Sequence, residues 1–303
     1  MQFLEQMNIV VPWKELVSMI EKHIPEVREE IGWRPRIEII KKLKMYFLSS
    51  WFNLSDIQTE EGIYDRASFQ RFMDIDVTTD QIPDSSTLCN FRIFLHTNKL
   101  WDKILSIVNE YMQQSWITLT EGRIIDATII KAPSSTKNEE KKRDPEMSST
   151  KKNNNFYFWA KIHIATDEKG IITELRTTTA KVHDSQVYDD LISDSDTRSL
   201  GDSAYEWQAI QDIANAKWIC HVAIIKRKRW QKELPIHARL RNTLLSMPRK
   251  VVEFPFGVIK DIRWHRQTKY RWLAKLHTQR CVLASLCNLY RMRWTLMNVS
   301  FSL

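Results

Sequence analysis

The sequence predicts an α/β protein in which a small all-α domain precedes a mixed sheet flanked by helices. Two observations favour this fold. Apolar residues recur at helical spacing as far as about residue 115, whereas from Arg123 onward they come in short β-branched runs separated by turn residues. We therefore expect a helical domain over residues 1–115 and a sheet-containing domain over residues 116–303.

The N-terminal domain is expected to contain several short helices. Apolar residues in 39–48 recur at helical spacing, and turn residues at 53–56 and 81–84 separate the helical segments. Asp84 precedes an amphipathic segment and is expected to cap its helix. A short helix-turn-helix and ordinary bundle packing both fit this pattern. The domain is expected to bind DNA or to dimerise.

Five candidate strands follow, at residues 123–130, 158–166, 171–180, 198–201 and 218–225. A turn signal between the second and third predicts a hairpin, so that the first three form an antiparallel meander. Helical segments at residues 183–192 and 206–216 are expected between the later strands. Three strands followed by helix, strand, helix, strand and helix is the order of the ribonuclease H-like fold, with a mixed five-stranded sheet.

The segment between the first two candidate strands, residues 131–157, is rich in Ser, Lys, Asn and Glu and has no apolar periodicity. We expect a flexible polar loop. A solvated linker is the simpler interpretation of its charges, and contact of its lysines with bound DNA is the alternative.

Composition narrows the class of protein. The chain has 303 residues, 43% of them apolar, with 12 Trp and 12 Phe, enough for a sizeable core. Its four cysteines form no Cys-x-x-Cys pair, which argues against a disulfide framework or a zinc site.

Apolar stretches fall short of the ~18–20 residues of a membrane span, and the start of the chain has no leader pattern, so we expect a cytoplasmic protein without a membrane partner. The six glycines form no phosphate-binding loop, and no nucleotide cofactor is expected.

The positive charge is concentrated near the C-terminus. Residues 226–303 carry 18 Lys and Arg against three acidic residues, a net charge of +15, while the other 225 residues carry −7. Such a field attracts polyanions, and interleaved aromatic residues favour nucleic acid over a merely solvated surface. The run that opens this region is expected to bind DNA: Lys226, Arg227, Lys228 and Arg229.

Three carboxylates accompany these elements. Asp126 lies in the first candidate strand, Asp202 ends the fourth, and Glu253 precedes the last helical segment. In the predicted fold these three positions meet at one edge of the sheet. Clustered acids repel one another, so at least one is expected to have a raised pKa and to bind metal in competition with protons.

Such a cluster suits phosphodiester chemistry. Two divalent cations about 3.5–4 Å apart activate the attacking oxygen, position the leaving oxygen and relieve charge on phosphorus. Mg²⁺ prefers oxygen ligands, so three carboxylates without His or Cys favour Mg²⁺, with Mn²⁺ as a substitute, and disfavour zinc. Structural roles are expected for His163, His183 and His221.

The region around Glu253 has a specific spacing. Arg249 precedes it by four residues and Lys260 follows by seven, so a continuous helix would present all three on one face. Pro255 is accepted in a first helical turn but not in an interior, so a helix starting near residue 254 would leave Glu253 at its mouth. The sequence leaves both geometries open.

Five sequence blocks resemble bacterial insertion-sequence DDE transposases. The catalytic blocks of that family are similar to Ile125-Asp126-Ala127-Thr128, Gly201-Asp202-Ser203-Ala204-Tyr205 and Arg249-x3-Glu253-x6-Lys260. Its helical domain is similar to Trp51-Phe52-Asn53-Leu54-Ser55-Asp56 and Ile82-Pro83-Asp84-Ser85-Ser86-Thr87-Leu88-x2-Phe91-Arg92. The resemblance covers roughly residues 40–292.

The resemblance implies a function and roles for named residues. Asp126, Asp202 and Glu253 would be catalytic and bind the metal, while Arg249 and Lys260 would contact phosphates at the transposon end. Relatives often carry a Tyr three positions before that Arg, where this chain has Ser246. The implied enzyme binds the inverted repeats of its own element, cuts a strand and transfers it to target DNA.

Further expectations follow from that function. The partner is double-stranded DNA, both element ends and target, and handling two ends together implies a homodimer or higher assembly on DNA, associated with the nucleoid when bound. The alternatives are a catalytically silent DNA-binding descendant, acting as repressor or inhibitor, and a non-mobile nuclease of the same fold.

Overall fold

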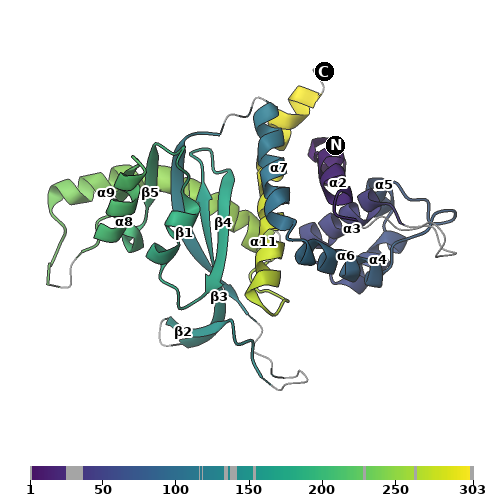
Figure 1. Ribbon diagram of the computed structural model, residues 1–303, viewed down its shortest axis with the longest axis horizontal. Coiled ribbons are helices and arrows are strands. Elements are labelled where there is room, and N and C mark those ends of the chain that lie inside the picture. Colours follow the sequence, from purple (N-terminus) through teal and green to yellow (C-terminus); the bar gives the residue numbers. More distant parts are fainter. Residues whose placement is uncertain are drawn as a thin grey trace. The chain divides into compact units, whose positions relative to one another are not determined.

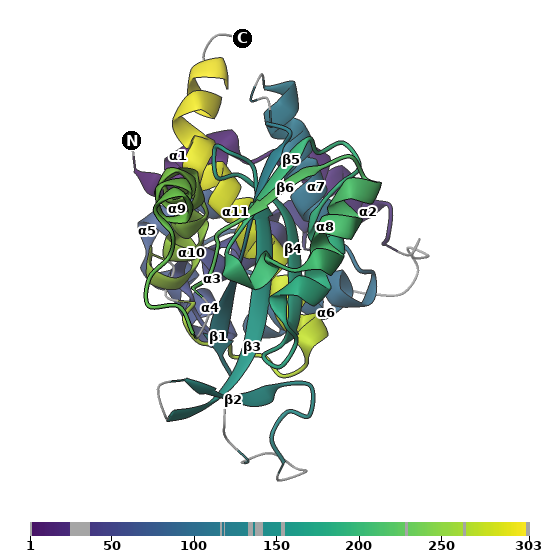
Figure 2. The same cartoon turned by 90° about the vertical axis from the view of Figure 1, so that its left-hand side faces the viewer.

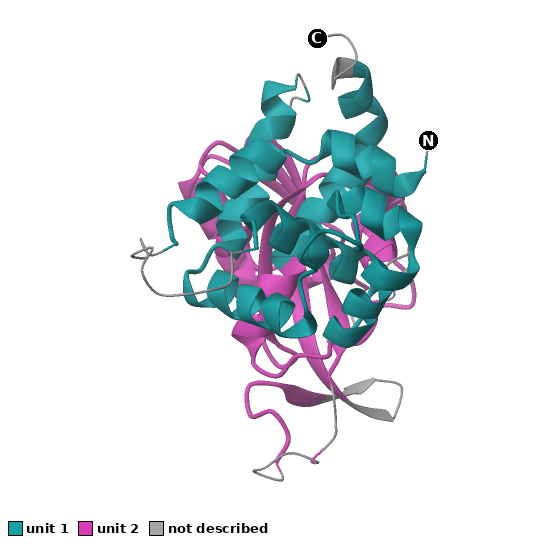
Figure 3. Ribbon diagram, turned by 90° about the vertical axis from the view of Figure 1, so that its right-hand side faces the viewer, with its two compact units in different colours: residues 1–117, 281–303 teal, residues 118–280 magenta. Residues whose placement is uncertain are grey.

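The computed structural model describes residues 2–24, 37–115, 117, 119–132, 136, 142–152, 155–227, 230–262 and 265–300. The chain divides into two compact units, coloured in Figure 3. The helical unit contains residues 1–117 and 281–303, and the sheet unit contains residues 118–280. Residues 281–303, which the sequence predicts to belong to the sheet-containing domain, group with the helical unit in the structure.

The helical unit is built from short amphipathic helices around one apolar core. Its helices are α1 (Phe3–Val10), α2 (Trp13–Glu21), α3 (Ile39–Phe52), α4 (Asp56–Asp65), α5 (Ala67–Met73), α6 (Ser85–Thr97), α7 (Trp101–Gln114) and the later part of α11 (Leu273–Ser300) (Figure 1). Trp51, Phe47 and Leu43 on α3 are almost fully buried, so α3 lies at the centre of this core.

Capping residues define where two of these helices begin. The Ser55 hydroxyl accepts from the Gln58 amide at 3.2 Å, while the Gln58 side chain accepts from the Ser55 amide at 2.9 Å, a reciprocal capping box. Asp84 accepts from the Thr87 amide at 2.7 Å and caps α6, as its sequence context predicts. Arg92 on α6 pairs with Asp56 at the start of α4 and links the two helices.

The sheet unit has six strands: β1 (Gly122–Lys131), β2 (Ser148–Lys152), β3 (Asn155–Thr166), β4 (Ile172–Thr179), β5 (Arg198–Gly201) and β6 (Cys220–Ala223). On one side of β1, β3 and β4 form an antiparallel meander. On its other side, β5 and β6 run parallel to it. The order β4-β3-β1-β5-β6 is the ribonuclease H-like arrangement that the sequence predicts.

Helices cover both faces of this sheet. Turns η1 (Asp184–Val187), η2 (Asp189–Leu191) and η3 (Ser203–Tyr205) accompany helix α8 (Gln208–Ala216). A second group consists of α9 (Ile236–Arg249), η4 (Lys250–Val252), α10 (Glu253–Gly257) and the π-helical turn η5 (Val258–Ile262). Figure 2 shows α8 and α9 on opposite sides of the sheet.

One apolar cluster fixes the first of these faces. Ile125 of β1 and Ala165 of β3 pack with Tyr188, and with Ile210 and Ala214 of α8. Side chains alternate along a strand, so the neighbours of Ile125 point to the other face. Residues 126 and 128 therefore face the side where η4 packs against β1.

Two local expectations need correction. The segment 131–157 is not simply a loop, because β2 pairs antiparallel with β3, from Ser148 opposite Trp159 to Lys152 opposite Asn155. Pairing with an existing strand satisfies the backbone without any apolar pattern in β2. Residues 183–192 form the turns η1 and η2 in place of a continuous helix.

Among the helices that the structure describes, none has the length and apolar character needed to span a membrane.

Candidate functional site

Asp126 lies where β1 separates from β5. The parallel pairing of these strands ends at Ile124 opposite Leu200, so Asp126 comes two residues after the last pair. Its carboxylate is mostly buried, with 22% of the side chain exposed. Oδ1 accepts a hydrogen bond of 2.8 Å from the Ala127 amide. The strand therefore holds this carboxylate at the opening between β1 and β5.

Asp202 follows the last residue of β5 and caps the turn η3. Its Oδ1 accepts from the Ala204 amide at 2.8 Å. Gly201 brings the chain close to Tyr205, since a Cβ at position 201 would lie 2.8 Å from the Tyr205 Cβ. The fully buried Tyr205 thus packs against the backbone that positions Asp202.

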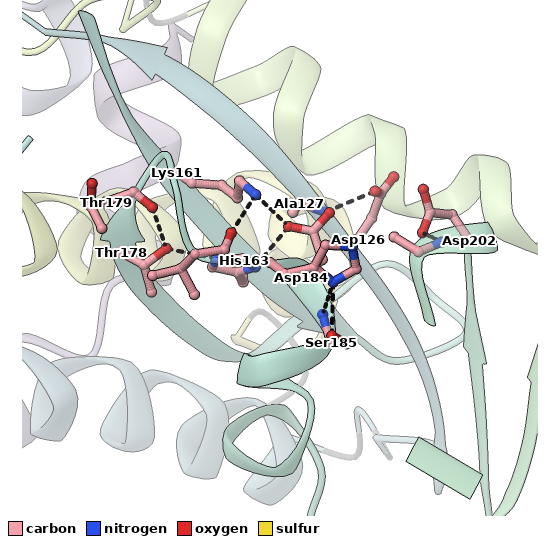
Figure 4. A network of polar contacts seen from close by, with 12 residues as sticks. Asp126, Ala127, Lys161, His163, Thr178, Thr179, Asp184, Ser185 and Asp202 are labelled. Atoms are coloured by element: carbon pink, nitrogen blue, oxygen red, sulfur yellow. Dashed lines mark hydrogen bonds and ion pairs between the residues drawn. The ribbon is translucent and has the colours of Figure 1, made fainter. Parts of the chain in front are cut away.

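The electrostatics show that the two aspartates are neighbours. The pKa of Asp126 is raised to about 6, chiefly by burial, and the negative charges of Asp202 and Asp184 contribute to the rise. The Ala127 amide and the Arg249 guanidinium oppose this shift. Figure 4 shows Asp126 between Asp184 and Asp202. The chain has therefore gathered three carboxylates around the point where β1 separates from β5.

Two basic residues reach the same face of β1 from the helical run 236–262. Arg249, the last residue of α9, places Nη2 3.6 Å from Asp126 Oδ2. Lys260 in η5 donates from Nζ to the hydroxyl of Thr128, two residues after Asp126 on β1. The spacing of Arg249 and Lys260, eleven residues apart, thus brings both to the face of β1 that carries Asp126.

Glu253 is the first residue of α10, and its backbone is helical. The helical run continues from α9 through η4 into α10, so Glu253 lies within it and Pro255 falls in the first turn of α10. The preceding residue, Val252, is fully buried, whereas Glu253 is exposed. Among the described residues, Glu253 makes no hydrogen bond or ion pair with Asp126 or Asp202.

A cavity of about 850 Å³ opens beside Asp202. Two residues of the basic run, Lys226 and Arg227, line it and are exposed. The Lys226 amide donates to Glu206 at 3.1 Å, and the Arg227 guanidinium donates to the Lys232 carbonyl at 2.7 Å. Lys228 and Arg229 lie outside the described residues.

A family model described as the transposase DDE domain matches residues 117–289, more than half of the chain. This chain belongs to the DDE transposase family. A second model, described as a transposase domain (DUF772), matches residues 1–93. The two matches cover the sheet-containing region and the N-terminal helices respectively.

A solved structure, the crystal structure of a pre-cleavage Mos1 transpososome, is similar at 11% sequence identity, over 90% of this chain and 85% of that chain. The TM-score is 0.20, so this likeness does not bear on the fold.

The transposase's donor set fits a hard divalent cation. DDE transposases as a family use divalent metal ions, and the groups that meet here are the carboxylates of Asp126, Asp202 and Asp184. Carboxylate oxygens are the ligands that Mg²⁺ and Mn²⁺ prefer. Burial first and the neighbouring acids second raise the pKa of Asp126, and a cation bound there would favour its ionised form.

Sequence reasoning on the transposase missed Asp184. Its position before Ser185 indicates only a helix cap, and η1 does begin there, although His183 provides the cap. Asp184 accepts from Lys161 Nζ at 2.8 Å and lies 3.7 Å from His163 Nδ1. A signal was present in the alternation of β3, because Lys161 and His163 share a face and are polar in an otherwise apolar strand.

Proposed function

We propose that this transposase binds the terminal inverted repeats of its own insertion sequence and catalyses metal-dependent DNA strand cleavage and strand transfer. The observation that carries the proposal is the proximity of Asp126, where β1 separates from β5, to Asp202 at the end of β5, with Arg249 against Asp126. Carboxylates beside a guanidinium suit a site that binds both a cation and a phosphate.

In the proposed reaction, water attacks the phosphorus of a phosphodiester at the element end. The bond from phosphorus to the 3′ oxygen breaks, and the element keeps a free 3′-hydroxyl. That hydroxyl then attacks a phosphodiester of target DNA, joining element to target and releasing a target 3′-hydroxyl. Each step exchanges one phosphodiester oxygen for another at the same site.

The acidic residues have the following proposed roles. Asp126, Asp202 and Glu253 hold the cations, Mg²⁺ in the cell with Mn²⁺ as substitute. Cations held by these residues would activate the attacking oxygen and relieve the negative charge on phosphorus. Glu253 directly follows η4, and η4 packs on β1, the strand that bears Asp126. The third carboxylate is therefore attached to a segment in contact with that strand.

The basic residues bind the DNA backbone in this proposal. Arg249 orients the Asp126 carboxylate and contacts phosphate, and Lys260 contacts phosphate beside Thr128. Lys226 and Arg227 line the cavity next to Asp202 and would contact the phosphates of the DNA strand where it leaves the site. Lys228 and Arg229 extend the same basic run in sequence.

The helical unit has a proposed role in binding DNA or in dimerisation. Both ends of the element have to be held together, so we propose a homodimer or a higher assembly on DNA.

The proposal is tested with DNA that carries the element's own ends and flanks. The transposase is incubated with Mg²⁺ or Mn²⁺, and strand cuts are mapped for the wild type, Asp202→Asn and Glu253→Gln. Asp212→Asn on α8 and Glu233→Gln are matched controls, because both remove a carboxylate from the same unit without touching the site.

We expect metal-dependent cuts at the element ends in the wild type and in both controls, and none in the two site variants. Cutting that persists in Asp202→Asn would contradict the assignment. Binding of the ends without cutting by the wild type would favour a silent DNA-binding descendant.

A further inference from the structure

Asp184 lies beside the proposed metal centre on the side of β1 that Arg249 does not reach. Ala127 pairs with His163 and Ile129 pairs with Lys161, so these residues share the face that packs against η1 and α8. Asp126 belongs to the opposite face, where Arg249 contacts it. Asp126 therefore has the Arg249 guanidinium on one side of the sheet and Asp184 on the other.

The position of Asp184 is held through one of its oxygens. Lys161 Nζ donates to Asp184 Oδ1 at 2.8 Å and to the Val182 carbonyl at 2.7 Å, which fixes the turn that carries Asp184. His163 Nδ1 is 3.7 Å from the same Oδ1. Both contacts use Oδ1, and Oδ2 has no hydrogen-bond partner among the described residues.

His163 supports this arrangement. Its side chain is fully buried, Nε2 lies 2.9 Å from the Thr178 hydroxyl, and Nδ1 has no hydrogen-bond partner within the described part of the chain. Burial lowers the pKa of His163 to about 4, so the imidazole is neutral at neutral pH. A neutral His163 adds no positive charge beside Asp184, so Lys161 is the cation that pairs with this carboxylate.

The charge of Asp184 nevertheless acts on the centre. It raises the pKa of Asp126 and of the buried Tyr205. Of the ion pair, the carboxylate is the member that faces Asp126, as Figure 4 shows.

We propose that Asp184 is a positioning residue of the metal centre, which strengthens divalent-cation binding by Asp126 and Asp202 through its negative charge. This inference rests on the proposed function of those two aspartates. Outer carboxylates of this kind tune metal affinity by orienting ligands and adding charge.

A purely structural role makes a different prediction. If the Lys161–Asp184 pair only fastens the turn to the sheet, removing either partner breaks the same tie and has the same effect. If Asp184 acts by its charge, Asp184→Asn and Lys161→Gln change the charge beside Asp126 in opposite directions. The sign of the two effects separates these cases.

The experiment measures Mn²⁺ binding to the full-length protein without DNA at a fixed neutral pH, with free Mn²⁺ followed by electron paramagnetic resonance. We expect Asp184→Asn to weaken binding about tenfold. We expect Lys161→Gln to tighten it, and Asp184→Glu to retain affinity near that of the wild type. Circular dichroism confirms that each variant is folded.

A second ion pair of the same unit provides the control. Lys217 and Asp189 are also 2.8 Å apart, away from the site, so Lys217→Gln and Asp189→Asn should leave Mn²⁺ binding unchanged. Weaker binding in both Lys161→Gln and Asp184→Asn, or no change in Asp184→Asn, would overturn the inference. If Asp184→Asn does not fold, Lys161→Gln decides alone, with tighter binding in favour and weaker binding against.

The wild type and Asp126→Asn separate this inference from the function beneath it. Loss of Mn²⁺ binding in Asp126→Asn, together with shifts of equal sign in the two Lys161–Asp184 variants, would reject only the role of Asp184. Full Mn²⁺ binding by Asp126→Asn would reject the proposed centre and the role of Asp184 with it.

Discussion

Arg249 Nη2 lies 3.6 Å from Asp126 Oδ2 and joins the end of α9 to the central strand of the sheet. The guanidinium lowers the pKa of a carboxyl that burial raises to about 6. The residue whose proposed role is to hold phosphate therefore also determines how readily Asp126 loses its proton.

We expect Arg249→Gln to move the pH dependence of Mn²⁺ binding to higher pH, because the pKa of Asp126 rises when this cation is removed. Titration of Mn²⁺ binding between about pH 5 and 8 checks the shift. Arg239→Gln, which removes an exposed arginine paired with Glu233, is the control and should leave the curve in place. An unmoved curve for Arg249→Gln would contradict the electrostatic link.

Metal-free stability gives a second prediction, for Asp126→Asn. The pKa of Asp126 in the folded protein, about 6, is above the ordinary value of 3.8, so the folded state holds its proton more tightly than the unfolded state. This contribution to stability is present at low pH and is lost as the pH rises from about 4 to 6. Above that window the ionised carboxylate opposes folding, and Asn removes the penalty.

In buffer with a chelator at pH 7.5, Asp126→Asn should melt roughly 5 °C above the wild type. Near pH 4 the difference should disappear. Thermal unfolding at both pH values provides the measurement, and an Asn variant that is less stable at pH 7.5 would show that the buried carboxylate is stabilised by its neighbours.

The close approach of Gly201 to Tyr205 gives a third prediction. A methyl group at position 201 would lie 2.8 Å from the Tyr205 Cβ and 2.9 Å from its ring, so Gly201→Ala should destabilise the protein by about 1–3 kcal/mol. Gly257 in α10 has nothing within 4 Å of an added Cβ, so Gly257→Ala should be neutral or slightly stabilising. Denaturant unfolding of both variants tests the contrast, and equal effects would refute it.

The proposed phosphate contact of Lys260 predicts a change in salt dependence. We expect Lys260→Gln to weaken binding to any DNA sequence and to reduce the slope of log K against log salt by about 1. Binding to specific and unrelated duplexes over a range of salt concentrations measures both quantities. Lys169→Gln, in the exposed turn between β3 and β4, serves as the charge-matched control. A sequence-dependent loss in Lys260→Gln would instead indicate contact with bases.

The sheet was predictable because its strands carry their own signals. β1 is an apolar, β-branched run that contains Asp126, β5 is a short segment followed by Asp202, and the turn between β3 and β4 is marked by residues 167–170. By contrast, β2 has no apolar pattern, since its pairing with β3 supplies its structure. A strand of that kind becomes visible only when its partner is known.

The site was predictable in part for a related reason. Asp126 lies on β1 two residues beyond its last pair with β5, and Asp202 follows the end of β5, so the parallel pairing of these strands brings the two aspartates together. Asp184 follows a strand by several residues in a turn, and its place depends on Lys161 and His163, which are distant in sequence. The geometry of Glu253 depended on whether the helical run continues past Pro255, a question that local sequence does not answer.

The parallel pairing of β1 with β5 has a consequence for how the protein is made. Asp126 and Asp202 come from strands separated by the whole β3–β4 hairpin, and the run with Arg249 follows later still. A chain emerging from the ribosome therefore exposes its N-terminal helices well before the two aspartates can meet. Prematurely terminated or clipped products that end before residue 202 lack half of the acidic pair, so incomplete copies are expected to be unable to cut DNA.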